Sequence, residues 1–168
     1  MELFTQPLAV RYLLDSSAIV KLVLREEGAA EVRRIFAEPR TFLVNSLCYA
    51  EVLNVLKRKW LSNKPGDKIN DDQYFGGCSV LTSFVRGKRI TIEDSMLEQI
   101  PVFERAKDIC LRHKIDIADA LQLVAMKEDR LRRIGAILVT ADGPLEKAAK
   151  AEGVRVWNCM KGNPPPTE

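Results

Sequence analysis

Histidine is nearly absent from this sequence, which has one, His113, in 168 residues. No second imidazole is available for a histidine-rich metal site, and a Ser-His-Asp triad or a Cys-His pair would depend on this residue alone. Because His113 lies near the end of a predicted helix, we expect it to be solvated. Any chemistry of the protein therefore has to use carboxylates, amines or hydroxyls.

Closely spaced cysteines and long apolar runs are also missing. The four cysteines lie 30, 32 and 49 residues apart, which excludes a C-x-x-C zinc or redox motif and indicates free, mostly buried thiols. No apolar run approaches the roughly 18 residues that cross a bilayer, and Glu2 places an acid where a signal peptide carries positive charge. We therefore expect a cytoplasmic protein without a membrane partner.

The chain carries little net charge. Its 26 Lys and Arg residues against 23 Asp and Glu residues give +3, which is too small to identify a nucleic-acid-binding protein. Hydrophobic residues make up 46% of the chain, enough for one domain with its own core, and we assign that domain to residues 1–160. The remaining residues, 161–168, contain three consecutive prolines and predict a flexible tail.

Short β-prone runs alternate with helical patterns along the chain. Between them, residues 62–77 carry turn signals and no sustained period, and we interpret this stretch as a loop or lid. Strands that alternate with helices predict right-handed βαβ units, and therefore an α/β fold with a mostly parallel sheet covered on both faces. The predicted strands are 10–14, 41–44, 88–92, 136–140 and 154–157, and the predicted helices are 18–24, 28–37, 46–56, 95–113, 116–133 and 144–152.

Two acids follow predicted strands. Asp15 ends the first strand, and Asp142 comes shortly after the strand over 136–140. Ligands of open parallel sheets bind beyond the carboxyl ends of the strands, so we expect both carboxylates to face the same edge. Each also has a structural interpretation, because Asp15 before Ser16 and Ser17 can cap a helix, and Asp142 can form a turn that caps one.

Further carboxylates lie on predicted helices. Glu51 shares its helical row with Leu47 and Val55, so its side chain is at least half-buried unless the helix is rotated to expose it. Asp119 follows Asp116 by three residues in the first turn of an apolar helix, which places both acids on one side. This pair also resembles a capping box, with Asp in place of Glu.

Several carboxylates that converge without histidine or lysine partners repel one another unless a cation lies between them. Oxygen ligands select hard ions such as Mg²⁺ or Mn²⁺ over zinc or copper, and these ions also bind substrate phosphates. The acids therefore point to phosphodiester chemistry. Basic residues in three groups, 57–59, 86–89 and 130–133, are candidate RNA contacts, although such runs are more often plain solvated faces.

Four stretches, taken in order, resemble the PIN-domain nucleases, and in particular the VapC-type toxin ribonucleases of type II toxin–antitoxin systems. Each stretch contains an acid, and together they span most of the chain. They are 12–19 (YLLDSSAI), 45–52 (NSLCYAEV), 117–123 (IADALQL) and 138–142 (LVTAD).

The resemblance implies a three-layer α/β/α sandwich with a parallel five-stranded sheet. The chain departs from the compact toxins of that family at about 61–88, where it carries a longer, Gly-rich insertion. The resemblance also implies a metal-dependent endoribonuclease, with Mg²⁺ or Mn²⁺ as cofactor and RNA as substrate. An antitoxin protein and a second copy of the chain, in a homodimer, are the implied partners. In the implied site, Asp15, Glu51, Asp119 and Asp142 form an acidic quartet, Asp116 is a further metal ligand, and Ser16, Ser17 and Thr140 supply supporting hydroxyls.

Other interpretations of the same residues are less favoured or stay open. A haloacid-dehalogenase-like phosphatase has a second Asp two residues after the first, where this chain has Ser17. A receiver-type domain places an acidic pair ahead of its phosphorylated Asp, and the acids here are distributed differently. A PIN nuclease of RNA processing, and a catalytically silent PIN-fold module that binds RNA or protein, both stay open beside the toxin.

Overall fold

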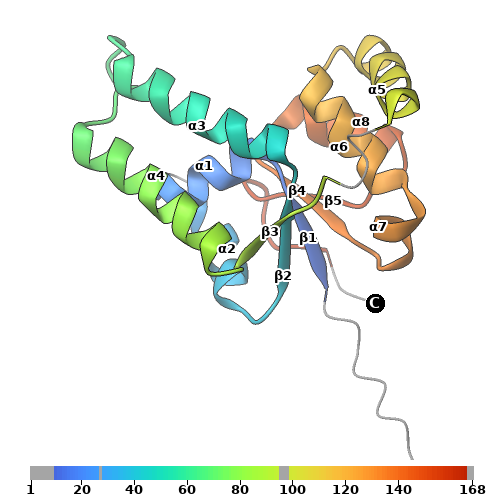
Figure 1. The fold of residues 1–168 in the computed structure, drawn as a ribbon, viewed down its shortest axis with the longest axis horizontal. Coiled ribbons are helices and arrows are strands. Elements are labelled where there is room, and N and C mark those ends of the chain that lie inside the picture. Colours follow the sequence, from blue (N-terminus) through green and yellow to red (C-terminus); the bar gives the residue numbers. More distant parts are fainter. Residues whose placement is uncertain (1–9, 27, 95–98, 166–168) are drawn as a thin grey trace, which may run out of the picture.

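Five parallel strands form the centre of the computed structural model, which describes residues 10–26, 28–94 and 99–165. The strand order is β3-β2-β1-β4-β5, and every neighbouring pair is parallel (Figure 1). The predicted α/β fold with a five-stranded parallel sheet is therefore confirmed. The strands are β1 (Arg11–Leu14), β2 (Thr41–Val44), β3 (Ile90–Ile92), β4 (Ile137–Thr140) and β5 (Val156–Asn158).

Helices cover both faces of this sheet (Figure 1). Along β1, Tyr12 and Leu14 belong to one buried cluster and Leu13 belongs to another, because successive side chains of a strand point to opposite faces. None of the helices within the described residues is long and apolar enough to cross a membrane. The first layer contains α1 (Ser16–Leu24), α2 (Ala29–Ala37), α3 (Ser46–Leu61) and α4 (Asp71–Arg86), and the second contains α5 (Ile100–His113), α6 (Ile117–Lys127), α7 (Asp129–Arg133) and α8 (Gly143–Ala151).

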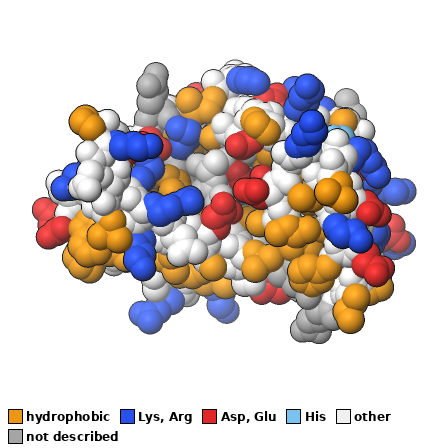
Figure 2. All heavy atoms as spheres, turned by 90° about the horizontal axis from the view of Figure 1, so that it is seen from above, with side chains coloured by type: hydrophobic (Ala, Val, Ile, Leu, Met, Phe, Trp, Pro, Cys, Tyr) orange, Lys and Arg blue, Asp and Glu red, His pale blue; other side chains and the backbone are white. Residues whose placement is uncertain are grey.

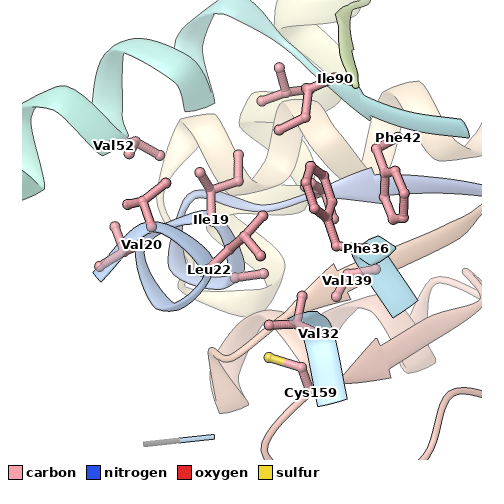
Figure 3. Close-up of a cluster of buried hydrophobic side chains, with 14 of the residues drawn as sticks. Ile19, Val20, Leu22, Val32, Phe36, Phe42, Val52, Ile90, Val139 and Cys159 are labelled. Atoms are coloured by element: carbon pink, nitrogen blue, oxygen red, sulfur yellow. The ribbon is translucent and has the colours of Figure 1, made fainter. Parts of the chain in front are cut away.

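The core of the first layer fixes the helices that follow β1 and β2. Ile19 of α1 and Val52 of α3 belong to the same buried cluster as Phe36 and Phe42, whose ring centroids lie 4.7 Å apart (Figure 3). Burial of each such side chain stabilises the fold by about 1.5–3 kcal/mol. Cys159 is buried in this cluster, and all four cysteines are free, as predicted.

Residues 71–86 form a helix, so the prediction of a loop or lid over 62–77 is wrong for its last part. The helix α4 begins after Asn70, which forms a capping box with Gln73: each side chain accepts a hydrogen bond from the other residue's backbone amide. Paired glycines concealed this helix, because glycine is a turn signal in a sequence. In the structure Gly77 is buried where α4 packs against α3.

The helix predicted over 95–113 begins later than expected. Its described part, α5, starts at Ile100, and residues 95–98 lie outside the described residues. Pro101, which could have kinked a longer helix, stands in the first turn of α5. Proline fits there because an amide in the first turn has no partner within the helix.

The boundaries near the C-terminus also differ from the prediction. The helix predicted over 116–133 is divided into α6 and α7 at Glu128, whose backbone is extended. The last strand begins at Val156 rather than at Val154. Val154 belongs to the turn that ends α8, because its amide donates to the carbonyl of Ala149 at 2.8 Å.

The chain changes direction across the sheet between β1 and β4. The strands β1, β2 and β3 proceed to one edge, and β4 and β5 then fill the other side of β1. In sheets of this type, ligands bind beyond the carboxyl ends of the strands at such a switch point. Asp15 directly follows β1, and one residue, Ala141, separates Asp142 from β4.

Candidate functional site

A hollow of about 380 Å³ opens at the carboxyl ends of the central strands. Figure 2 shows acidic side chains gathered near the middle of the upper face, between two lobes of the molecule. The hollow brings together all five acids that the sequence singles out, from four separate parts of the chain. The described residues that line it are Asp15, Ser16, Ser17, Val20, Lys21, Glu26, Glu51, Val55, Asp116, Asp119, Ala141 and Asp142.

Asp15 forms the floor of the hollow and has 2% of its surface exposed. Its Oδ1 accepts hydrogen bonds from Gln122 Nε2 at 3.0 Å and from Ser16 Oγ at 3.4 Å. Its Oδ2 accepts from Thr140 Oγ1 at 2.9 Å and from both the hydroxyl and the amide of Ser17. A buried carboxylate needs such donors to replace its lost hydration, and together they fix its position.

Two hydroxyls join the end of β1 to the end of β4. Ser17 Oγ and Thr140 Oγ1 lie 3.2 Å apart, and both contact Asp15. Ser17 Oγ also accepts a hydrogen bond from the amide of Ala141 at 2.8 Å, and Thr140 Oγ1 accepts one from the amide of Asp142 at 2.9 Å. Thr140 is fully buried, so its hydroxyl holds Asp15 from beneath the hollow and is not part of the hollow's surface.

Of the capping interpretations, two hold and one does not. Asp15 caps α1, and Asp142 caps α8, with Oδ1 accepting from the amide of Leu145 at 2.7 Å. Asp116 precedes α6, but its side chain makes no capping hydrogen bond, and so the capping box with Asp119 does not form. The exposed carboxylate of Asp116 therefore stands at the edge of the hollow without a role in holding the helix.

Glu51 is half-buried on α3, so the rotated helix that would leave it in water is not what forms. Its Oε2 atom is buried and has no hydrogen-bond partner within the described residues. Leaving a buried carboxylate oxygen without a partner costs free energy. This position therefore favours a ligand that offers a proton or a positive charge.

Burial and the neighbouring carboxylates raise the pKa of Asp119. The pKa of Asp119 rises from its ordinary value of 3.8 to about 8. Burial is the largest cause, and the negative charges of Asp15, Asp142, Glu51 and Asp116 follow in that order. These four acids therefore lie near enough to Asp119 for their charges to repel it.

The acids fit a divalent cation in the type of donor they offer. All are carboxylate oxygens, the ligands that Mg²⁺ and Mn²⁺ prefer, and the buried oxygen of Glu51 still lacks a partner. Across the described part of the chain, no three His, Cys, Asp or Glu side chains are arranged to hold an ion as they stand. Coordination would therefore require some of these side chains to turn toward a common point.

Gln122 belongs to the site but was missed in the sequence. It is fully buried on α6, and its Nε2 donates to Asp15 Oδ1. The other amide atom, Oε1, is buried and lacks a hydrogen-bond partner among the residues described. The available signal was a polar residue three positions after Asp119, between Leu121 and Leu123 in the apolar middle of the helix.

Lys21 and Glu26 also line the hollow and were missed. Glu26 lies between two lysines, with Oε1 2.7 Å from Lys59 Nζ and Oε2 3.8 Å from Lys21 Nζ. The carboxylate thus joins α1 to α3 at this end of the hollow. The signal in the sequence was the spacing of Lys21, one helical turn after Ser17.

Away from the hollow, the expectation for His113 is wrong, and Arg89 has structural partners. His113 is not simply solvated, because its Nε2 lies 2.7 Å from Glu152 Oε1 and its side chain is 17% exposed. Arg89, one of the candidate RNA contacts, donates to the carbonyls of Phe36 and Glu38. Its guanidinium holds the end of α2 against the sheet, a role that depends on tertiary contacts.

Comparison with known families assigns this architecture. The model of the PIN domain matches residues 12–151, a range that contains every acid of the hollow. The chain belongs to the PIN domain family. The PIN domain has a nuclease-type fold, so the family resemblance seen in the four sequence stretches is confirmed at this level.

A solved structure shares the PIN fold of this chain. The crystal structure of PAE2754 from Pyrobaculum aerophilum is similar, with a TM-score of 0.55 and 17% sequence identity, over 90% of this chain and 92% of that chain. At this identity the likeness shows a common fold. Among curated proteins, no match is found.

Proposed function

We propose that this PIN domain is a divalent-metal-dependent endoribonuclease that hydrolyses RNA phosphodiester bonds. The buried, unpaired Oε2 of Glu51 carries the proposal, since it lies in one hollow with Asp15, Asp119 and Asp142. A cation among these oxygens would give the unpaired oxygen a partner and would offset the repulsion between the carboxylates. Membership of the PIN family supports the same chemistry.

Four carboxylates, those of Asp15, Glu51, Asp119 and Asp142, would hold Mg²⁺ or Mn²⁺, with Asp116 at the exposed edge. A bound ion of this kind lowers the pKa of its water and stabilises negative charge on the phosphate, so that no protein nucleophile is needed. Asp15 would be the rigid ligand, because its hydrogen-bond donors leave it little freedom.

The remaining residues would orient these ligands and the attacking water. Ser16, Ser17 and Thr140 hold Asp15 through their hydroxyls. Glu51 would use its unpaired Oε2 either to complete the ligands of the ion or to accept a hydrogen bond from the attacking water. In-line attack by that water, as the PIN resemblance implies, would leave a 5′-phosphate and a 3′-hydroxyl on the products.

Cleavage of a panel of structured and single-stranded RNAs tests the proposal. Wild-type protein should cleave with Mg²⁺ or Mn²⁺ and stop in EDTA, and Asp15→Asn and Glu51→Gln should each lose about 100-fold or more in rate, because such metal assistance is worth several kcal/mol. Glu31→Gln is a matched control, since Glu31 pairs with Arg34 on α2 outside the hollow. Equal cleavage by wild type and both site variants would contradict the proposal, and RNA binding without cleavage would favour a silent binding module.

We propose further that the nuclease is a VapC-like toxin that works in the cytoplasm as a homodimer. The support is the resemblance of the four sequence stretches to that group. An antitoxin protein could occlude the carboxylates with an arginine, whose guanidinium forms paired hydrogen bonds with carboxylates. Expression of wild type should arrest bacterial growth, whereas Asp119→Asn should not. Normal growth with wild type, in a strain without the antitoxin, would favour a role in RNA processing.

A further inference from the structure

The hollow holds many negative charges and a single positive one on its described lining. Lys21 is the basic residue there, and a phosphodiester strand that enters meets carboxylates on the other sides. Because RNA is itself an anion, its approach is unfavourable unless positive charge compensates for this field. The acids of the lining are Asp15, Glu26, Glu51, Asp116, Asp119 and Asp142.

The helix α1 directs Lys21 into the hollow. Ser17, Val20 and Lys21 are spaced three and four residues apart, so they share one face of the helix, and all three line the hollow. Ser17 contacts Asp15 directly, which places Lys21 one turn from the floor of the site. The side chain of Lys21 is 17% exposed, so its charge is less screened by solvent than that of a surface lysine.

Glu26 holds this lysine at the end of the hollow where α1 meets α3. Its Oε1 lies 2.7 Å from Lys59 Nζ, within hydrogen-bond distance, whereas its Oε2 lies 3.8 Å from Lys21 Nζ. The Lys21 contact is therefore an ion pair without a direct hydrogen bond. Two lysines thus share the Glu26 carboxylate at this end of the hollow.

We propose that Lys21 binds a backbone phosphate of the RNA, next to the phosphate that is cut, and that Glu26 positions it. The inference rests on the proposed function, because it specifies how the same hollow would hold its substrate. A lysine contact to a phosphate carries no base information, so Lys21 would strengthen the binding of every RNA sequence alike.

The test is a measurement of kcat and KM over a range of NaCl concentrations at fixed Mn²⁺, on the single-stranded RNA that wild type cleaves fastest. Lys21→Met should raise KM about tenfold at low salt and leave kcat within about twofold, because the contact is made equally in the ground state and the transition state. The slope of log KM against log salt should fall by about 0.7, the value for one phosphate contact on a single strand.

Two further variants separate charge from structure. Lys21→Arg keeps the charge and should keep the slope close to that of wild type. Lys107→Met removes the same charge from an exposed position on α5 and should leave both KM and the slope unchanged. Fluorescence anisotropy in the Asp119→Asn background, where the RNA is not cut, should show the same loss of affinity for Lys21→Met.

The outcomes distinguish this inference from the proposed function. If wild type cleaves RNA and Lys21→Met behaves like Lys107→Met, the role of Lys21 is overturned and the proposed function stands. A wild type that cleaves no RNA overturns the proposed function and this inference with it. If circular dichroism shows that Lys21→Met does not fold, Lys21→Gln, which keeps a polar end group, takes its place with the same expected results.

Discussion

Gln122 donates a hydrogen bond from Nε2 to Oδ1 of Asp15 at 3.0 Å, although the two residues are 107 positions apart in the chain. Both side chains are buried, at 0% and 2% exposure. The bond joins α6 to the end of β1 directly beneath the candidate metal site. A residue that contributes no carboxylate thus helps to orient the acid at the floor of the hollow.

Replacing Gln122 should therefore destabilise the protein. Gln122→Met removes the donor from a buried carboxylate, and a hydrogen bond to a charged group is worth about 1.5–3 kcal/mol, so the free energy of unfolding should fall by that amount in urea titrations. Gln122→Glu should cost more, because it places a second carboxylate beside Asp15. A Gln122→Met variant as stable as wild type would show that Asp15 is held without this bond.

The metal-free protein should lose stability as the pH rises. The pKa of Asp119 is about 8 in the folded protein and 3.8 ordinarily, so between these values the folded chain keeps a proton that the unfolded chain releases. The contribution of this proton to the free energy of unfolding is fully present below about pH 4 and is lost as the pH rises to about 8. Asp119→Asn removes this titration, and in EDTA it should gain stability relative to wild type from pH 5 to pH 8. A difference that stays constant over this range would contradict the raised pKa.

Asp116 should matter for activity and not for stability. Its side chain is exposed and makes no capping bond, so Asp116→Ala should change the free energy of unfolding by less than about 0.5 kcal/mol. Cleavage should still weaken if the carboxylate helps to hold the metal. A loss of about 1 kcal/mol in stability with unchanged cleavage would instead restore its interpretation as a helix cap.

Gly28 should be intolerant of a side chain. It precedes α2 with a φ of 80°, and an added Cβ would collide with the thioether of Met160. Gly66 is a matched control, because its φ is 87° but nothing lies within 4 Å of an added Cβ. We expect Gly66→Ala to lower the free energy of unfolding by about 1–2 kcal/mol, because alanine is strained in the left-handed backbone conformation. Gly28→Ala should lower it further, because its Cβ also meets Met160. Equal losses would show that Met160 moves aside freely.

The sequence predicts the acids of the site better than it predicts their surroundings. Asp15 and Asp142 could be placed because each follows a continuous apolar strand, and parallel strands bring such residues to one edge. Glu51 could be found because a carboxylate in an apolar helical row is unusual. These three signals lie within single segments, so they can be identified without knowing how the helices pack.

The parts that the sequence concealed depend on contacts between distant segments. Gln122 gains its role from Asp15, and Lys21 gains its role from a carboxylate that Lys59 also binds. Arg89 resembled a surface charge until the fold placed backbone carbonyls around it. The periodicity of a single segment does not show such partners. It also does not show that the paired glycines of α4 lie in a helix that packs against α3.

Calorimetric titration of the metal-free protein with Mn²⁺ at pH 8, for wild type and for Asp119→Asn, tests the metal site most directly. Wild type should bind Mn²⁺, and Asp119→Asn should bind it at least about tenfold more weakly, because one carboxylate ligand is lost. Equal affinity in the two proteins, or no binding by wild type, would contradict the claim that these carboxylates form a metal site.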